Sequence, residues 1–121
     1  MPTVRTLDQE RAAYAWQCVA KCSKDYVNLV KGAPALIMSN GLMQALAYYQ
    51  EKSQEGKQLV SHVGGWLRKC GLTSGDEFSQ LMQSLHGSEA VTYMRATTET
   101  IEVLKWIKQV GAAVVDSRST K

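Results

Sequence analysis

The sequence has little of what marks a membrane or a secreted protein. None of its apolar runs approaches the roughly 20 residues that span a bilayer, so we expect no membrane segment. Residues 1–5 lack the apolar core of a signal peptide. The three cysteines are an odd number, and without a secretion signal they indicate reduced thiols. These absences together predict a cytoplasmic protein.

The motifs of several large enzyme classes are also missing. The patterns G-x-x-x-x-G-K-[ST], G-x-G-x-x-G, H-E-x-x-H and G-x-S-x-G do not occur. Only two histidines are present, His62 and His86, and neither has a neighbour in the sequence that suggests a catalytic partner. We interpret both as surface or capping residues and expect no enzymatic activity.

The cysteines do not show the spacing of a metal site. Cys18 and Cys22, at positions i and i+4, would place two thiolates on one helical face. Zinc would need two more ligands, for which Cys70 and His62 are the only plausible set. Because no C-x-x-C pair is present, we interpret the cysteines as small buried residues and expect neither a metal nor a cofactor.

What is present is the composition of one soluble globular domain. Of the 121 residues, 45% are hydrophobic and 21% are charged. Apolar residues recur with helical spacing, and neither strand-like alternation nor an internal repeat is visible. We therefore predict an all-α fold, a single-domain bundle of about six helices with long first and last helices. The domain should span residues 1–121, with flexible ends at about 1–5 and 116–121.

The first helix is expected to run from about Leu7 to Lys31. Thr6 and Gln9 have the spacing of a capping box, and apolar positions then follow at intervals of three and four. Gly32 ends this helix, and Pro34 suits the first turn of the next one. A second corner at residues 39–41 should follow, in which Ser39 or Asn40 caps a helix that begins near Leu42.

The remaining elements follow from linkers and caps. Residues 53–56 look like a polar linker, and the next helix contains Gly64-Gly65, which implies either a close helix contact or a break. A second capping box at residues 74–77 should open a helix that ends at His86. Ser88 should cap the last helix, which is expected to continue to about Val115.

The basic residues are the best functional signal from the residues alone. The net charge of +3, from 14 basic and 11 acidic residues, permits a polyanionic partner without requiring one. Lys21, Lys24 and Lys31 share a face of the first predicted helix. Lys105 and Lys108, at positions i and i+3, are neighbours on the surface of the last one. Two interpretations stay open, a solvated polar face or a set of phosphate contacts.

The three tryptophans, Trp16, Trp66 and Trp106, raise the possibility of base stacking. Each lies on a predicted helix rather than on an exposed sheet or in a groove. We therefore interpret them first as core or protein-interface residues.

Two stretches carry a family resemblance. The first is residues 6–15, TLDQERAAYA, followed by the corner residues 33–37, APALI, and 39–46, SNGLMQAL. The second is residues 93–108, YMRATTETIEVLKWIK. In this order, separated by a variable helical middle, they resemble the small subunit of type III-B CRISPR effector complexes, the Cmr family. The resemblance covers nearly the whole chain.

The resemblance implies a small, non-catalytic all-α protein that acts in antiviral defence. Several copies would stack into an inner filament alongside the repeated backbone subunit. The assembly would hold a guide RNA and pair it with a target RNA, whose backbone the small subunits would touch. Target cleavage would belong to the backbone subunit, and cyclic-nucleotide chemistry to the large polymerase-like subunit.

The predicted RNA contacts are chosen by their place in or beside the matching stretches and by their grouping on helix faces. The first choice is Arg11, Lys31, Arg95, Lys105 and Lys108, followed by Lys21 and Lys24. A charge of only +3 is consistent with weak phosphate contacts that are multiplied over several copies. The clearest departure from the family pattern is Gln109-Val110, which stands where a basic and then an aromatic residue is common.

Two other functions stay open. One is a helical adaptor whose apolar surface, around Trp16 or Trp106, docks another protein without binding RNA. The other is an enzyme that uses His62 or His86 with a cysteine.

Overall fold

The computed structural model describes residues 4–75 and 77–119, with only the backbone described for residues 116–119. Within these residues the chain is helical and has no strand, so the all-α fold class is confirmed. No helix in the described part is long and apolar enough to cross a membrane. The helices are α1 (Leu7–Val19), α2 (Lys24–Lys31), α3 (Ala33–Asn40), α4 (Leu42–Lys52), α5 (Gln54–Lys69), α6 (Phe78–His86) and α7 (Ala90–Ser119).

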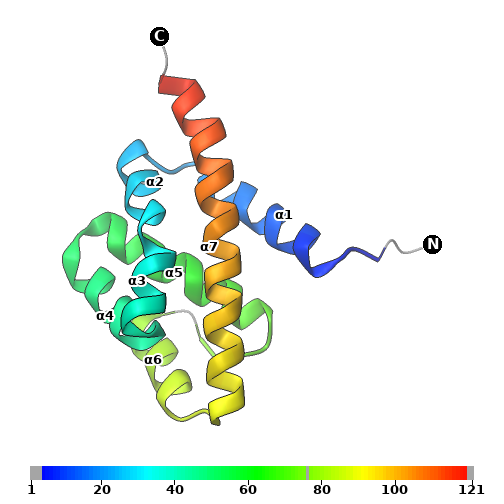
Figure 1. Cartoon of the computed structure of the whole chain (residues 1–121), viewed down its shortest axis with the longest axis vertical. Coiled ribbons are helices and arrows are strands. Elements are labelled where there is room, and N and C mark those ends of the chain that lie inside the picture. Colours follow the sequence, from blue (N-terminus) through cyan, green and yellow to red (C-terminus); the bar gives the residue numbers. More distant parts are fainter. Residues whose placement is uncertain (1–3, 76, 120–121) are drawn as a thin grey trace.

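The last helix is the element around which the others are arranged. α7 contacts α1, α2, α3 and α5, while α4 packs on α3 and α5, and α6 closes the bundle against α4 and α5 (Figure 1). Its inward residues Ala96, Val103, Leu104 and Ile107 are fully buried. At 3.6 residues per turn these positions form one face, which buries apolar surface against four neighbouring helices.

The prediction of one helix over Leu7–Lys31 is wrong, because two helices, α1 and α2, occupy that range. The Thr6–Gln9 capping box is present, and α1 ends at Val19. Residues 20–23 then connect it to α2, where the Ser23 hydroxyl caps the new helix by accepting a hydrogen bond from the Tyr26 backbone N–H. Ser23 offers the backbone a local alternative to the helical hydrogen bonds, and this competes with continuation of the helix.

The double corner exists, with a different second cap from the one predicted. Pro34 lies in the first turn of α3, as expected. Ser39 and Asn40 are the last residues of α3 and do not cap α4; the Ser39 hydroxyl donates to the Ala35 carbonyl instead. Gly41 forms the corner with φ of 89°, a conformation that favours glycine. The Tyr93 hydroxyl from α7 accepts the Met43 backbone N–H in the first turn of α4.

The predicted linker at residues 53–56 is wrong, because Ser53 alone joins α4 to α5. Its hydroxyl accepts a hydrogen bond from the Gly56 backbone N–H, so residues 54–56 already form the first turn. At Gly64-Gly65 the helix is unbroken. The close helix contact holds at Gly65, because a Cβ there would lie 2.5 Å from the hydroxyl of Tyr14 on α1.

Two further predicted caps are also wrong. α6 begins at Phe78 with Glu77 as its N-cap, and Ser74 instead makes hydrogen bonds to Ser84, so it starts no helix. Asp76 lies outside the described residues. The Ser88 hydroxyl donates to the Leu85 carbonyl at the end of α6, and α7 begins at Ala90.

The predicted end of the last helix, near Val115, is also too early, because α7 continues to Ser119. Part of the expected tail is therefore helical. Residues 1–3 and 120–121 of the two expected flexible ends lie outside the described residues.

Gly56 is the position where packing requires a glycine most strictly. A Cβ at Gly56 would overlap the backbone carbonyl of Tyr49 on α4, and a backbone atom cannot rotate away. We expect Gly56→Ala to lower the free energy of unfolding by about 2 kcal/mol and the Tm by roughly 8 °C, measured by thermal and urea unfolding.

Gly32→Ala is the matched control. Gly32 has φ of −93°, and a Cβ added there would have nothing within 4 Å, so alanine should be neutral or stabilising by up to about 1 kcal/mol. Equal losses in both variants would show that the contact between α4 and α5 is looser than described.

Candidate nucleic-acid interface

Three of the predicted RNA contacts lie on α7, and they span its exposed face. Arg95 and Lys105 are exposed and Lys108 is half-buried. At 3.6 residues per turn Arg95 and Lys108 are about 140° apart around the helix, with Lys105 between them. The Lys105 ammonium is 3.2 Å from a carboxylate oxygen of Glu102. These cations therefore lie across the helix and do not form one row along it.

The cations of α2 lie beside α7. Lys24 and Lys31, at the two ends of α2, are both exposed. They stand at i−3 and i+4 from Val27, which faces Gly111 of α7 so closely that a Cβ there would be 2.9 Å from a Val27 methyl carbon. On α7, Lys108 is three residues before Gly111 and so flanks the same contact from the other helix. We define the α2–α7 seam as the Val27–Gly111 contact together with Lys24, Lys31 and Lys108, which flank it.

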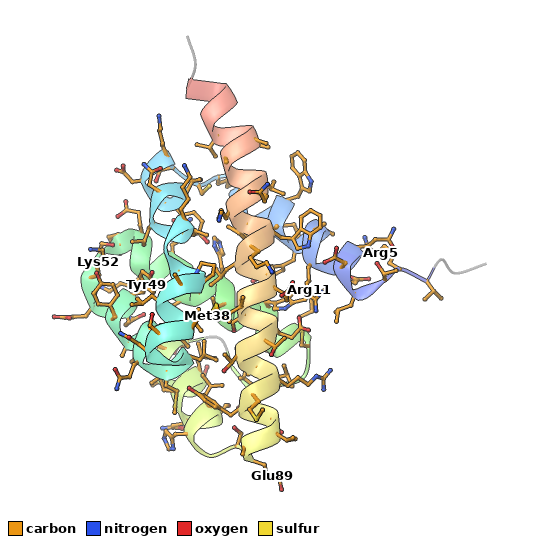
Figure 2. The ribbon with its side chains drawn as sticks, viewed as in Figure 1. Arg5, Arg11, Met38, Tyr49, Lys52 and Glu89 are labelled. Atoms are coloured by element: carbon orange, nitrogen blue, oxygen red, sulfur yellow. The ribbon has the colours of Figure 1, made fainter. Side chains whose placement is uncertain are left out.

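Lys21 and Arg11 are placed differently from the prediction. Lys21 is exposed, but it lies in the connection at residues 20–23, so it does not share a helix face with Lys24 and Lys31. The Arg11 side chain is only 14% exposed. Its guanidinium donates to both carboxylate oxygens of Glu99, at 3.1 and 2.7 Å, and lies between α1 and α7 (Figure 2). Arg11 is thus an internal ion-pair partner away from the seam.

Glu99 also accepts a hydrogen bond from the Trp66 indole N–H at 3.1 Å, so one carboxylate joins α7 to α1 and α5. Burial alone raises the pKa of Glu99, but the hydrogen bonds from Arg11 and Trp66 outweigh it, and the pKa lies below the usual 4.5. Glu99 therefore stays ionised at neutral pH and stabilises the fold there.

The two histidines and Cys18 have different surroundings in the described residues. His62 Nδ1 is 2.5 Å from the Tyr26 hydroxyl, while His86 is exposed at the end of α6. Burial raises the pKa of Cys18 to about 12, so its thiol is protonated at neutral pH. No group of three or more potential metal-ligating side chains is found in the part of the chain that the structure describes.

One pocket with basic residues in its lining was not predicted from the sequence. It lies between α1 and α5 and has a volume of about 550 Å³. The residues that line it include Tyr14, Gln17, Ser61, His62, Arg68 and Lys69. The only signal of it in the sequence is the adjacent basic pair Arg68-Lys69. Only the packing of α1 against α5 shows that these cations border a concave surface.

The tryptophans have three different environments. Trp66 is 1% exposed in the core, as the interpretation of core residues predicts, whereas Trp16 is 56% exposed on α1. Trp106 is half-buried on α7, and its indole N–H donates to Asp8 at 2.8 Å.

These observations define the class: a small helical-bundle protein whose functional candidates, in the described residues, are exposed cations on helices packed around one long helix. A family model described as CRISPR-associated protein (Cas_Cmr5) matches residues 7–114, and the chain belongs to this family. The resemblance seen in the sequence is thereby confirmed.

Individual relatives agree with the family assignment. A protein of Thermotoga maritima named CRISPR system Cmr subunit Cmr5 is 28% identical over 116 residues, which cover 93% of this chain and 87% of the relative. Another of that name from Thermus thermophilus is 25% identical over 118 residues, covering 93% and 99%. The X-ray crystal structure of a CRISPR-associated Cmr5 family protein from Thermus thermophilus shares the fold, with a TM-score of 0.76 at 24% identity over 92% of this chain and 99% of that chain.

The largely buried ion pair between Arg11 and Glu99 gives a stability prediction. Glu99→Leu should lower the free energy of unfolding by about 3 kcal/mol, because the Arg11 guanidinium loses both of its hydrogen bonds to Glu99 and keeps only the exposed Asp8 at 3.4 Å. The double variant Arg11→Met/Glu99→Leu should recover part of that loss, since both charges are then gone. The exposed pair Lys105–Glu102 is the control, and Glu102→Ala should cost less than about 1 kcal/mol in urea unfolding. A double variant no more stable than Glu99→Leu would contradict this account.

His62 gives a pH prediction. Burial lowers the pKa of His62 below its usual 6.5, so the unfolded chain binds a proton first as the pH falls. The stability of the folded protein should therefore decrease as the pH falls from about 7 through 6.5. His62→Asn, whose amide oxygen can accept the Tyr26 hydroxyl, should remove this decrease in urea unfolding, whereas His86→Asn should keep it. If His62→Asn and His86→Asn lost stability equally as the pH falls, the effect would belong to a group other than His62.

Proposed function

We propose that this protein is a non-catalytic small subunit of a type III-B CRISPR (Cmr) ribonucleoprotein effector in the cytoplasm. Several copies stack into an inner filament that supports pairing of guide RNA with target RNA during antiviral defence. Its protein partners are further copies of itself, the repeated backbone subunit and the large polymerase-like subunit. Membership of the Cas_Cmr5 family supports the assembly, because relatives are named as Cmr subunits.

The α2–α7 seam is the observation that carries the RNA contact. Three lysines from two helices, Lys24, Lys31 and Lys108, border one line, as expected for a surface that follows a phosphate backbone. Lys105 and Arg95 extend this surface across α7, and Lys21 adds a cation before α2. Arg11 is left out of the proposed contacts, because both of its Glu99 hydrogen bonds would have to break.

Weak contacts of this kind are sufficient for a repeated subunit. Each copy needs only a few phosphate contacts, because linked copies raise one another's effective concentration. Sequence is read by base pairing between guide and target, so the subunit needs no group that reads base edges. The protonated Cys18 thiol and the position of His62 against Tyr26 support a non-catalytic role.

A helical adaptor without RNA binding is the second candidate. The observation that favours it is exposed apolar surface, with Trp16 56% and Met38 75% exposed. Both side chains are available to a protein partner. In this case charge changes along the seam would leave RNA retention unaffected.

Charge reversal separates these functions. In the assembled complex, Lys105→Glu/Lys108→Glu and, separately, Lys24→Glu/Lys31→Glu should weaken target RNA binding. Each lost phosphate contact should reduce the slope of log affinity against log salt by roughly 0.7 to 0.9 per copy, measured by filter binding from low to high salt.

Lys52→Glu/Lys57→Glu is the matched control, because it makes the same charge change on α4 and α5. Circular dichroism melts should confirm that all three variants fold and assemble. An unchanged salt slope in both Lys24→Glu/Lys31→Glu and Lys105→Glu/Lys108→Glu, with the complex intact, would refute RNA contact here and leave the adaptor function.

A further inference from the structure

A pocket between α1 and α7 shares only Lys105 with the proposed RNA contacts. It has a volume of about 390 Å³ and is lined by Asp8, Glu102, Lys105, Trp106 and Gln109. Trp106 and Lys108 are about 160° apart around α7 at 3.6 residues per turn. The pocket and the α2–α7 seam therefore lie on opposite edges of the exposed face of α7.

The aromatic wall of the pocket is held in place. The indole N–H of Trp106 donates to Asp8 Oδ1 at 2.8 Å, and the Arg11 guanidinium reaches the same oxygen at 3.4 Å. The indole cannot rotate away without losing this hydrogen bond. A half-buried, fixed ring facing an open pocket is preorganised to stack a flat group, because little side-chain entropy remains to be lost on binding.

The lining of the pocket is acidic. Asp8 and Glu102 bring two carboxylates, while Lys105 brings one ammonium, which is already 3.2 Å from Glu102 Oε2. Arg11 does not line the pocket; its guanidinium pairs with Glu99 at 2.7 Å and more loosely with Asp8 at 3.4 Å, so Glu99 balances its charge. In the described residues Asp8 Oδ2 and Glu102 Oε1 have no hydrogen bond. One negative charge in excess and two available acceptor oxygens therefore adjoin the indole.

These features together select one kind of ligand. A nucleotide base could stack on Trp106, but its phosphates would meet two carboxylates and a lysine that is already paired. An apolar side chain would cover the carboxylates without giving them a donor, which is costly. A guanidinium satisfies both requirements, because its face stacks on an indole and its N–H groups pair with carboxylates.

We propose that this pocket receives an arginine side chain of a protein partner. The guanidinium lies against Trp106 and donates to Asp8 and Glu102. The pocket and the seam are on opposite edges of α7 and share no residue, so Lys24→Glu/Lys31→Glu should leave arginine binding intact even where it weakens RNA binding.

The test is a titration of the full-length, ¹⁵N-labelled protein with the capped peptide Gly-Arg-Gly, followed by NMR of the three indole N–H signals. Trp→Phe variants assign the signals. The Trp106 signal should shift saturably, with a dissociation constant on the order of millimolar for so small a probe. The buried Trp66 and the exposed Trp16 are internal controls and should not shift in this way.

Matched probes and variants test the chemistry. The citrulline peptide, which is neutral and nearly the same shape, should bind roughly fivefold or more weakly, and Glu102→Gln should weaken the arginine peptide by a similar factor. Gln109→Arg places a guanidinium at the pocket wall within the chain and should reduce binding, whereas Gln44→Arg on α4 should not.

Three results would overturn the assignment. Equal binding of the citrulline peptide would mean a pocket that recognises shape without charge. A Trp106 shift caused by a short oligouridine and not by the arginine peptide would mean a nucleotide pocket. Equal shifts of Trp16 and Trp106 would mean non-specific stacking on any accessible indole.

Discussion

The ion pair between the half-buried Arg11 and the buried Glu99 is the interaction on which the arrangement around α7 depends. Glu99 accepts two hydrogen bonds from Arg11 of α1 and one from Trp66 of α5, so a single carboxylate connects three helices. A buried charge is tolerated only while its partners remain in place. This requirement, together with the apolar residues beside Glu99, decides which face of α7 turns inward and which residues stay exposed.

Once that face is set, the rest of α7 is divided into two edges with different chemistry. The edge next to α2 carries Lys108 beside Lys24 and Lys31, and is positive. The edge next to α1 carries Trp106 with Asp8 and Glu102, and is aromatic and acidic. A helix with two such edges can face a polyanion on one side and a basic protein segment on the other. This agrees with the position proposed above, between RNA on one side and protein neighbours on the other.

Much of the fold was predictable because its signals are local. The Thr6–Gln9 capping box, the corner at Pro34 and the long last helix all follow from residues close together in the chain. The break after Val19 was missed because the three-and-four spacing of apolar residues continues through residues 20–23, and both sides are buried. The cap of α4 was misplaced because Tyr93, fifty residues away, supplies a hydrogen bond there.

The sequence by itself determined the all-α class, the family and the set of cations, because helical periodicity and motif order are properties of the chain. Only the tertiary structure decided what each cation does. Arg11 and Lys105 were equally plausible RNA contacts in the sequence, yet the half-buried Arg11 is paired with Glu99, 88 residues away, while Lys105 is exposed. The physical reason is that periodicity records which face of a helix is buried, but not which partner covers it. That partner determines whether a charge is neutralised internally or left for a ligand.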